Sequence, residues 1–109
     1  MQITVQHINQ DPATGNVLGF DNVAEVSVYH TKDIDEALEY AYRYTNNIDG
    51  SWSMKIGSDA NDDVTVLAPL PVYNGRTYGL RSTSMFDRMV VNGKTYKVSM
   101  VGFTEMENV

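Results

Sequence analysis

A cluster of hydroxyl groups beside a carboxylate is the pattern in this chain with the clearest chemical potential. Arg81–Ser84 reads Arg-Ser-Thr-Ser, and Asp87 follows three residues later. Nucleophilic catalysis by a hydroxyl also needs a general base, usually histidine, and no histidine is close in the sequence. The pattern favours a polar turn whose side chains bond local backbone amides. Two alternatives stay open: partner recognition by Arg81 or Ser82, and a small hydrolase or nucleotide-modifying enzyme that uses Asp87, Arg81 and Ser82.

The two histidines are the next candidates for acid–base or metal chemistry. His7 continues the apolar face of an alternating segment at 2–8, and His30 ends a similar segment at 23–29. A short connection makes two such strands antiparallel neighbours, so the histidines are expected at opposite ends of the sheet. We therefore expect each histidine to be at the surface or satisfied by local hydrogen bonds, with no shared metal site.

An acidic loop begins at Asp59 like a calcium-binding loop, with Asn61 and Asp63 at the alternate positions. Val64 then stands where the sharp turn needs glycine, and Leu70 stands where a bidentate glutamate is required. The loop is therefore predicted to be polar and exposed, with at most adventitious calcium affinity. Since the chain has no cysteine, disulfides and cysteine-containing zinc sites are excluded. We expect no cofactor and no bound metal.

Charge is unevenly distributed along the 109 residues, whose formal net charge is −6. Residues 1–63 hold 11 acidic and 3 basic residues, a balance of −8, and residues 64–109 hold 3 acidic and 5 basic residues, a balance of +2. This balance argues against direct nucleic-acid binding, because polyphosphate attracts lysine and arginine. The acidic half is either a solvated face or a patch that meets a basic partner, for instance by imitating nucleic-acid phosphates.

A helix is predicted from about Asp33, which has Glu36 at the spacing of a capping box. Its buried stripe consists of Ile34, Ala37, Leu38, Ala41 and Thr45. The tyrosines at 40, 42 and 44, with Trp52, either pad the core or form an aromatic surface beside the acids. The residues predicted to contact a partner are Asp35, Glu36, Glu39, Tyr40, Asp59, Asp62, Asp63 and Arg81.

The remaining segments read as strands and turns. Alternation predicts strands at 2–8, 23–29, 51–56 and 64–67. Two Asn-Gly pairs, Asn74-Gly75 and Asn92-Gly93, lie between apolar alternations and predict two-residue β-hairpins. One helix cannot cover both faces of a sheet. The chain is therefore predicted to form a single α+β domain over 1–109, with one helix packed on a mainly antiparallel twisted sheet that could curl into a partial barrel.

The length suits one domain, and no apolar run approaches the roughly 20 residues of a membrane span. The N-terminus alternates in hydropathy and does not resemble a signal peptide. We expect a cytoplasmic protein that does not contact membranes.

The C-terminal quarter carries a family resemblance. Its residues are Arg81–Asp87, Val90, Val91, Tyr96, Val98, Gly102, Phe103 and Glu105. They resemble the ending of small YodL-like proteins of phages, plasmids and conjugative elements, and Asp11–Gly19 is similar to openings in those proteins. Phe86 stands where that family favours Gly or Ser, and Arg88 where it favours Val or Ile. The resemblance implies an accessory protein of a mobile element and supplies no catalytic residues.

The function expected from the sequence is binding of a host or phage protein without catalysis. Inhibition of a host defence system through the acidic surface is its most concrete form. Two alternatives to this function are a minor virion or assembly component and a small hydrolase. The sequence leaves the oligomeric state open.

Overall fold

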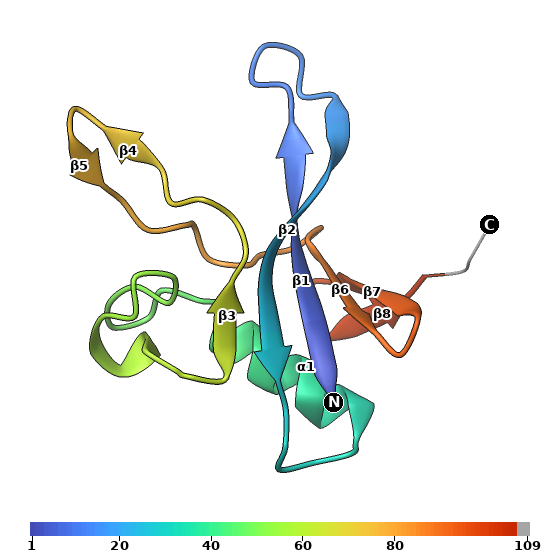
Figure 1. The fold of residues 1–109 in the computed structure, drawn as a ribbon. Coiled ribbons are helices and arrows are strands. Elements are labelled where there is room, and N and C mark those ends of the chain that lie inside the picture. The colour runs from blue at the N-terminus through green and yellow to red at the C-terminus, as the bar shows by residue number, and fades with distance from the viewer. Residues whose placement is uncertain (107–109) are drawn as a thin grey trace.

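The computed structural model describes residues 1–106, which form an antiparallel sheet with one helix against it. Its two longest strands, β1 (Gln2–Gln10) and β2 (Val17–Ser27), lie side by side. Figure 1 shows α1 (Ile34–Arg43) crossing beneath the lower ends of these strands. The prediction of an α+β fold with a mainly antiparallel twisted sheet is confirmed, and the sheet does not close into a barrel, because β3 and β8 are its free edges.

The main sheet has six strands in the order β3-β2-β1-β6-β7-β8, and every neighbouring pair is antiparallel. The shorter strands are β3 (Val64–Val66), β6 (Arg88–Val91), β7 (Lys94–Val98) and β8 (Phe103–Glu105). A short 3-10 helix, η1, spans Gly57–Asp59. A separate hairpin of β4 (Val72–Tyr73) and β5 (Arg76–Thr77) projects from the body of the molecule (Figure 1).

Both Asn-Gly pairs turn hairpins, as the sequence predicts. Asn92 has φ 52° and Gly93 has φ 74°, and the pair at 74–75 has nearly the same values. Positive φ at both central positions is the requirement of a type I′ turn. Because the second turn has two residues, Arg88 pairs directly with Lys97 across β6 and β7. The turn therefore sets which side chains lie opposite one another in this hairpin.

A long-range pairing brings the two ends of the chain together. β6 lies antiparallel to β1, with Thr4 opposite Val90 and Gln6 opposite Arg88. The C-terminal hairpin therefore extends the sheet from the N-terminal strand. The residues that precede β6 consequently lie beside the upper half of β1.

The helix begins as predicted, although its capping box is only half formed. Asp33 accepts a hydrogen bond from the Glu36 amide at 3.0 Å. The Glu36 carboxylate accepts from the Thr31 hydroxyl at 2.6 Å, where a full capping box would have it reach back to the Asp33 amide. The predicted buried stripe is confirmed for Ala37, Leu38, Ala41 and Thr45, while Ile34 is half-buried.

The hydrophobic core lies between α1 and one face of the sheet. Its strand residues are Ile3, Val5, Val23, Ala24, Val26, Val64, Met89, Val91 and Val98. The pleat sends alternate side chains to the opposite face, where Asn22, Gln6, Arg88, Lys97 and Thr104 form one row across five strands. That face is polar because the single helix covers only the other one (Figure 1).

The strand predicted at 51–56 is wrong. Ser51 and Ile56 form an isolated bridge that closes a tight loop, with Lys55 at φ 57°. Trp52 points into the core with none of its surface exposed, whereas Met54 and Ile56, expected on the same face, are exposed. A short alternation of apolar residues does not distinguish a strand from a loop, because a strand also needs a neighbour with which to pair.

Candidate binding groove

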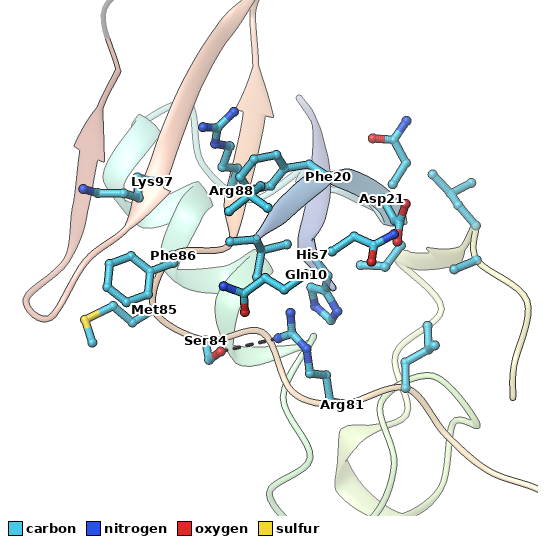
Figure 2. Close-up of a pocket in the computed structure, with 18 of the residues that line it drawn as sticks. His7, Gln10, Phe20, Asp21, Arg81, Ser84, Met85, Phe86, Arg88 and Lys97 are labelled. Carbon is cyan, nitrogen blue, oxygen red and sulfur yellow. Dashed lines mark hydrogen bonds between the residues drawn. The ribbon is translucent and has the colours of Figure 1, made fainter. Parts of the chain in front are cut away.

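An open groove of about 1490 Å³ runs beside the upper half of β1 (Figure 2). Its walls come from 7–10, 17–23, 67–69 and 80–88, and Lys97 of β7 completes them. β1 continues past the first residue of β6, so the segment before β6 lies against the strand without forming a ladder. The groove therefore exists because two strands of unequal length are paired.

Asp87 is the structural centre of this segment. Its carboxylate is fully buried and accepts the amide of Ile8 at 2.8 Å and the amide of Ser84 at 2.8 Å. The guanidinium of Arg81 donates to both carboxylate oxygens, at 2.6 and 2.8 Å. Burial alone would raise the pKa of Asp87, but the hydrogen bonds from Arg81 and the two amides outweigh it and leave the pKa lowered. A permanent carboxylate thus fastens the segment to β1.

The turn that leads into Asp87 carries two exposed apolar side chains. The Asp87 amide donates to the Ser84 carbonyl at 3.0 Å, and Phe86 has φ 79°, as at the third position of a type II turn. That position usually holds glycine, because a Cβ is strained there. Met85 is 42% exposed and Phe86 is 55% exposed, and both line the groove (Figure 2). A strained aromatic residue is therefore held toward solvent.

His7 heads a chain of hydrogen bonds that leads into the helix. The Thr45 hydroxyl donates to the Ala41 carbonyl at 2.8 Å, and the Thr83 hydroxyl donates to Thr45 at 2.9 Å. Thr83 must then accept from His7, whose Nε2 lies 2.9 Å away, so the network assigns the proton to Nε2. Burial lowers the pKa of His7 to about 4, although the Asp87 charge opposes this shift. At neutral pH the ring is uncharged, and its Nδ1 is an acceptor.

The group of His7, Asp87 and Thr83 contains the residue types of a hydrolytic triad but not its arrangement. In such a triad the base takes the hydroxyl proton on one nitrogen and holds the carboxylate through the other. Here Nε2 faces both Thr83, at 2.9 Å, and Asp87, at 3.9 Å. Nε2 donates to Thr83, whose own proton goes to Thr45. Thr83 is therefore not activated as a nucleophile.

Cations and an aromatic ring form the wall of the groove nearest β6 and β7. The guanidinium carbon of Arg88 lies 3.7 Å from the centroid of the Phe20 ring, and Figure 2 shows the two side chains together. Lys97 reaches the same wall from the neighbouring strand. Asp21 also lines the groove, on the β2 side.

Asp59 was predicted to lie in an exposed acidic patch, and this prediction is wrong. Its carboxylate is fully buried. One oxygen accepts the amides of Ile48, Asp49 and Gly50 at 2.9, 2.9 and 2.6 Å, and the other accepts from Arg43 at 3.0 Å. The Gly50 amide in particular lowers the pKa of Asp59 against the opposing effect of burial. Three backbone amides of the loop point to one place and need an acceptor there. The carboxylate of Asp59 supplies it and so stabilises the loop.

Two other predicted partner residues are also engaged internally. The Tyr40 hydroxyl donates to Asp63 at 2.6 Å and accepts from the Asn61 amide at 2.9 Å. Burial, together with the bond to Asp63, raises the pKa of Tyr40. The remaining acids of the predicted patch, Asp35, Glu36, Glu39 and Asp62, are exposed on α1 and the loop after η1. They lie toward the helical end of the sheet, and Arg81 is the predicted residue that lines the groove.

Of the two alternatives for Trp52, the structure supports packing in the core. The indole is fully buried, and its N–H donates to the Arg81 carbonyl at 2.9 Å. The indole lies edge-on to the His7 ring, with centroids 6.3 Å apart. Trp52 therefore supports the floor of the groove from below. His30, by contrast, is exposed beyond the end of β2 and lies against Tyr40, so the two histidines are separate as predicted.

Sequence reasoning did not identify His7, Phe20, Phe86, Arg88 and Lys97 as members of one site. The pairing of β1 with β6 joins residues about 80 positions apart, and no local pattern encodes it. One signal was available: a two-residue turn at Asn92-Gly93 places Arg88 opposite Lys97 by counting outward from the turn.

Within residues 1–106, no three His, Asp or Glu side chains are grouped so that they could hold a metal ion. The helices in this part of the chain are too short or too polar to span a bilayer.

By fold and site, the chain belongs to the class of small α+β domains with an open groove at one end of an antiparallel sheet. Comparisons with family models, with curated proteins and with solved structures return no match.

Proposed function

We propose that the protein acts by binding a partner protein through the groove and does not catalyse a reaction. The observation that carries this proposal is Phe86. It is 55% exposed at the rim of the groove and has φ 79° in a turn that glycine would form without strain. Strained residues that persist on a protein surface gather at functional sites, and exposed aromatic residues are the common anchors of protein interfaces.

The surroundings of Phe86 support a preformed binding site. Met85 stands beside it, and the Phe86 amide donates to the Val98 carbonyl at 2.9 Å, which holds the turn on the sheet. Arg81 and Asp87 clamp the same turn from below. A rigid turn loses little entropy when a partner binds, and this favours affinity. The direction of the proton between His7 and Thr83 supports a binding role in preference to catalysis.

The resemblance of the C-terminal quarter to YodL-like proteins supplies the biological setting of the proposal. The protein would be an accessory protein of a phage or other mobile element in the cytoplasm of the host cell, and its partner a host or phage protein. Inhibition of a host defence system remains the most concrete form. The exposed acids Asp35, Glu36, Glu39 and Asp62 are a second surface for such a partner, whereas the buried Asp59 is removed from it.

The proposal is tested with two matched variants. Phe86→Ala removes the exposed ring at the groove, and Tyr73→Ala removes a similarly exposed ring from the β4–β5 hairpin. Tagged wild-type protein captures partners from host cells with and without the mobile element, and each partner is identified, purified and measured by calorimetry. We expect Phe86→Ala to weaken binding at least about tenfold, the effect of losing an interface anchor, and Tyr73→Ala to leave it unchanged. A purified partner that binds Phe86→Ala as tightly as wild type would contradict the proposal.

A further inference from the structure

Two cationic residues lie directly opposite each other across two strands of the groove wall. Arg88 on β6 and Lys97 on β7 form one cross-strand pair, and both side chains lie on the face away from α1. Side chains that face each other in this way have Cβ atoms about 5 Å apart, and like charges there destabilise the sheet. Their neighbours in the same row are the neutral residues Gln6 and Thr104. Within residues 1–106 neither cation forms an ion pair.

The position of Arg88 leaves its donors available to a ligand. One face of its guanidinium covers the Phe20 ring at 3.7 Å, which fixes the plane of the group. A guanidinium held by stacking still presents its N–H groups along the edges, in the geometry that matches a carboxylate. Figure 2 shows the charged ends of Arg88 and Lys97 directed away from each other, with Phe86 below Lys97. The wall therefore combines a cationic pair with an exposed aromatic ring.

The charge of the groove is opposite to that of the whole protein. Arg81 is neutralised by Asp87, so among residues 1–106 Arg88 and Lys97 outnumber Asp21, the remaining acid of the lining. The chain as a whole carries −6. A long polyphosphate would meet this negative charge beyond the groove, whereas a short acidic segment would meet only the local positive charge.

We propose that the groove recognises an acidic polypeptide segment: a carboxylate of the partner binds the N–H edge of Arg88 and draws the flexible side chain of Lys97 toward it, and an adjacent apolar side chain packs on Met85 and Phe86. This inference rests on the proposed function and names the chemistry of the partner. The two cations repel each other in the free protein, and a bound carboxylate offsets this repulsion. The loss of the repulsion therefore contributes to the free energy of binding. Specificity then comes from the charge pair, and the aromatic turn contributes contact area.

The test uses a defined probe in place of the unidentified partner. Isotope-labelled full-length protein is titrated by NMR with the capped peptide acetyl-Gly-Ser-Asp-Phe-Ser-Gly-amide and with its Asn counterpart. The variant is Lys97→Gln, and the matched control is Lys94→Gln, which removes the same charge from the same strand outside the groove, where Lys94 pairs with Glu105 at 3.5 Å. We expect the Asp peptide to bind wild type about tenfold more tightly than the Asn peptide and to shift the amides of Phe86, Arg88 and Lys97.

Lys97→Gln should abolish this discrimination, and Lys94→Gln should retain it. Equal affinity of wild type for the two peptides would overturn the inference, as would shifts confined to surfaces outside the groove. If oligo(dT) displaces the Asp peptide at a concentration below that of the peptide, the groove binds nucleic acid and the inference is overturned. Self-association that is lost in Lys97→Gln, seen by size-exclusion chromatography, would assign the groove to a second copy of this chain, with the same consequence.

A second measurement does not depend on any ligand. Lys97→Gln should raise the melting temperature of the free protein by about 1–4 °C, because it removes the repulsion opposite Arg88, and Lys94→Gln should not raise it. No rise in Lys97→Gln would mean that the pair carries no repulsion for a ligand to relieve. If Phe86→Ala no longer binds the purified partner while Lys97→Gln still binds it, the inference of an acidic segment is wrong and the proposed function stands. If both variants keep the partner, both proposals fail.

Discussion

Asp87 and Ile8 are 79 positions apart in the sequence, yet the carboxylate of Asp87 accepts the backbone N–H of Ile8 at 2.8 Å. This bond lies just past the end of the β1–β6 ladder, whose last pair is Gln6 and Arg88. It takes the place of a further backbone pair between the two strands. The same carboxylate holds Arg81 and the Ser84 amide. One buried charge therefore ends the ladder, shapes the turn before it and leaves the groove open beside β1.

The first prediction concerns this carboxylate. Asp87→Asn removes the charge that four donors share, and we expect it to lower the free energy of unfolding by about 2–3 kcal/mol, since solvent reaches part of Arg81 and limits the loss. Urea unfolding measures the change. Glu105→Gln breaks the exposed pair with Lys94 and should change stability by less than about 0.5 kcal/mol. If Asp87→Asn unfolds at the same urea concentration as wild type, the charge of Asp87 does not stabilise the fold.

The second prediction concerns the strained turn. Phe86→Gly should stabilise the free protein by about 1 kcal/mol, because glycine adopts the φ of 79° without the strain of a Cβ. Met85→Gly, one position earlier, should destabilise it by about 0.5–1 kcal/mol, because there glycine only adds freedom to the unfolded chain. Chemical unfolding of both variants measures the difference. If both substitutions destabilise equally, Phe86 bears no strain.

The third prediction is a pH dependence that arises from His7. Its pKa of about 4 in the folded protein lies below the usual 6.5, so the unfolded chain binds a proton that the folded protein excludes. Stability is therefore complete above pH 6.5 and falls as the pH drops from 6.5 to about 4, by about 3 kcal/mol at most. Asp87 and Arg81 face the ring, and the lowered pKa of Asp87 makes its own loss of stability occur below about 3.8.

The control for this dependence is His7→Gln, whose amide can still donate to Thr83 but does not titrate. Thermal unfolding in buffers from pH 4 to pH 7 should show a sloping melting temperature for wild type and a flatter one for the variant. Equal slopes for the two proteins would show that another group causes the dependence.

The fourth prediction concerns the loop that follows the helix. Asp59→Asn replaces an oxygen that accepts three amides, and it weakens the contact with Arg43. We expect faster hydrogen exchange at the amides of Ile48 and Gly50 and a lower melting temperature. Asp62→Asn, in the exposed part of the same acidic segment, should change neither quantity. Protection of these amides that survives in Asp59→Asn would mean that the loop is held by other contacts.

Several elements could be predicted from the sequence because their causes are local. An Asn-Gly pair between two apolar alternations favours the positive φ of a type I′ turn, so both hairpins were predictable, and so was the pairing of Arg88 with Lys97. Asp33 starts the helix through a hydrogen bond within its own turn. The same reasoning failed at 51–56, where the alternation around Trp52 is typical of a strand but the chain forms a closed loop.

The sequence by itself determined the helix and the hairpins, since each depends on residues a few positions apart. It also determined the charge asymmetry, which follows from composition, and the α+β class, which follows from the order of the elements along the chain. Only the tertiary structure decided the site. The pairing of β1 with β6 brings His7 and Ile8 to Asp87. The folded chain also buries Asp59, whose carboxylate accepts the amides of its own loop. Long-range pairing depends on how whole faces fit together in the folded chain, and neighbouring residues in the sequence do not encode it.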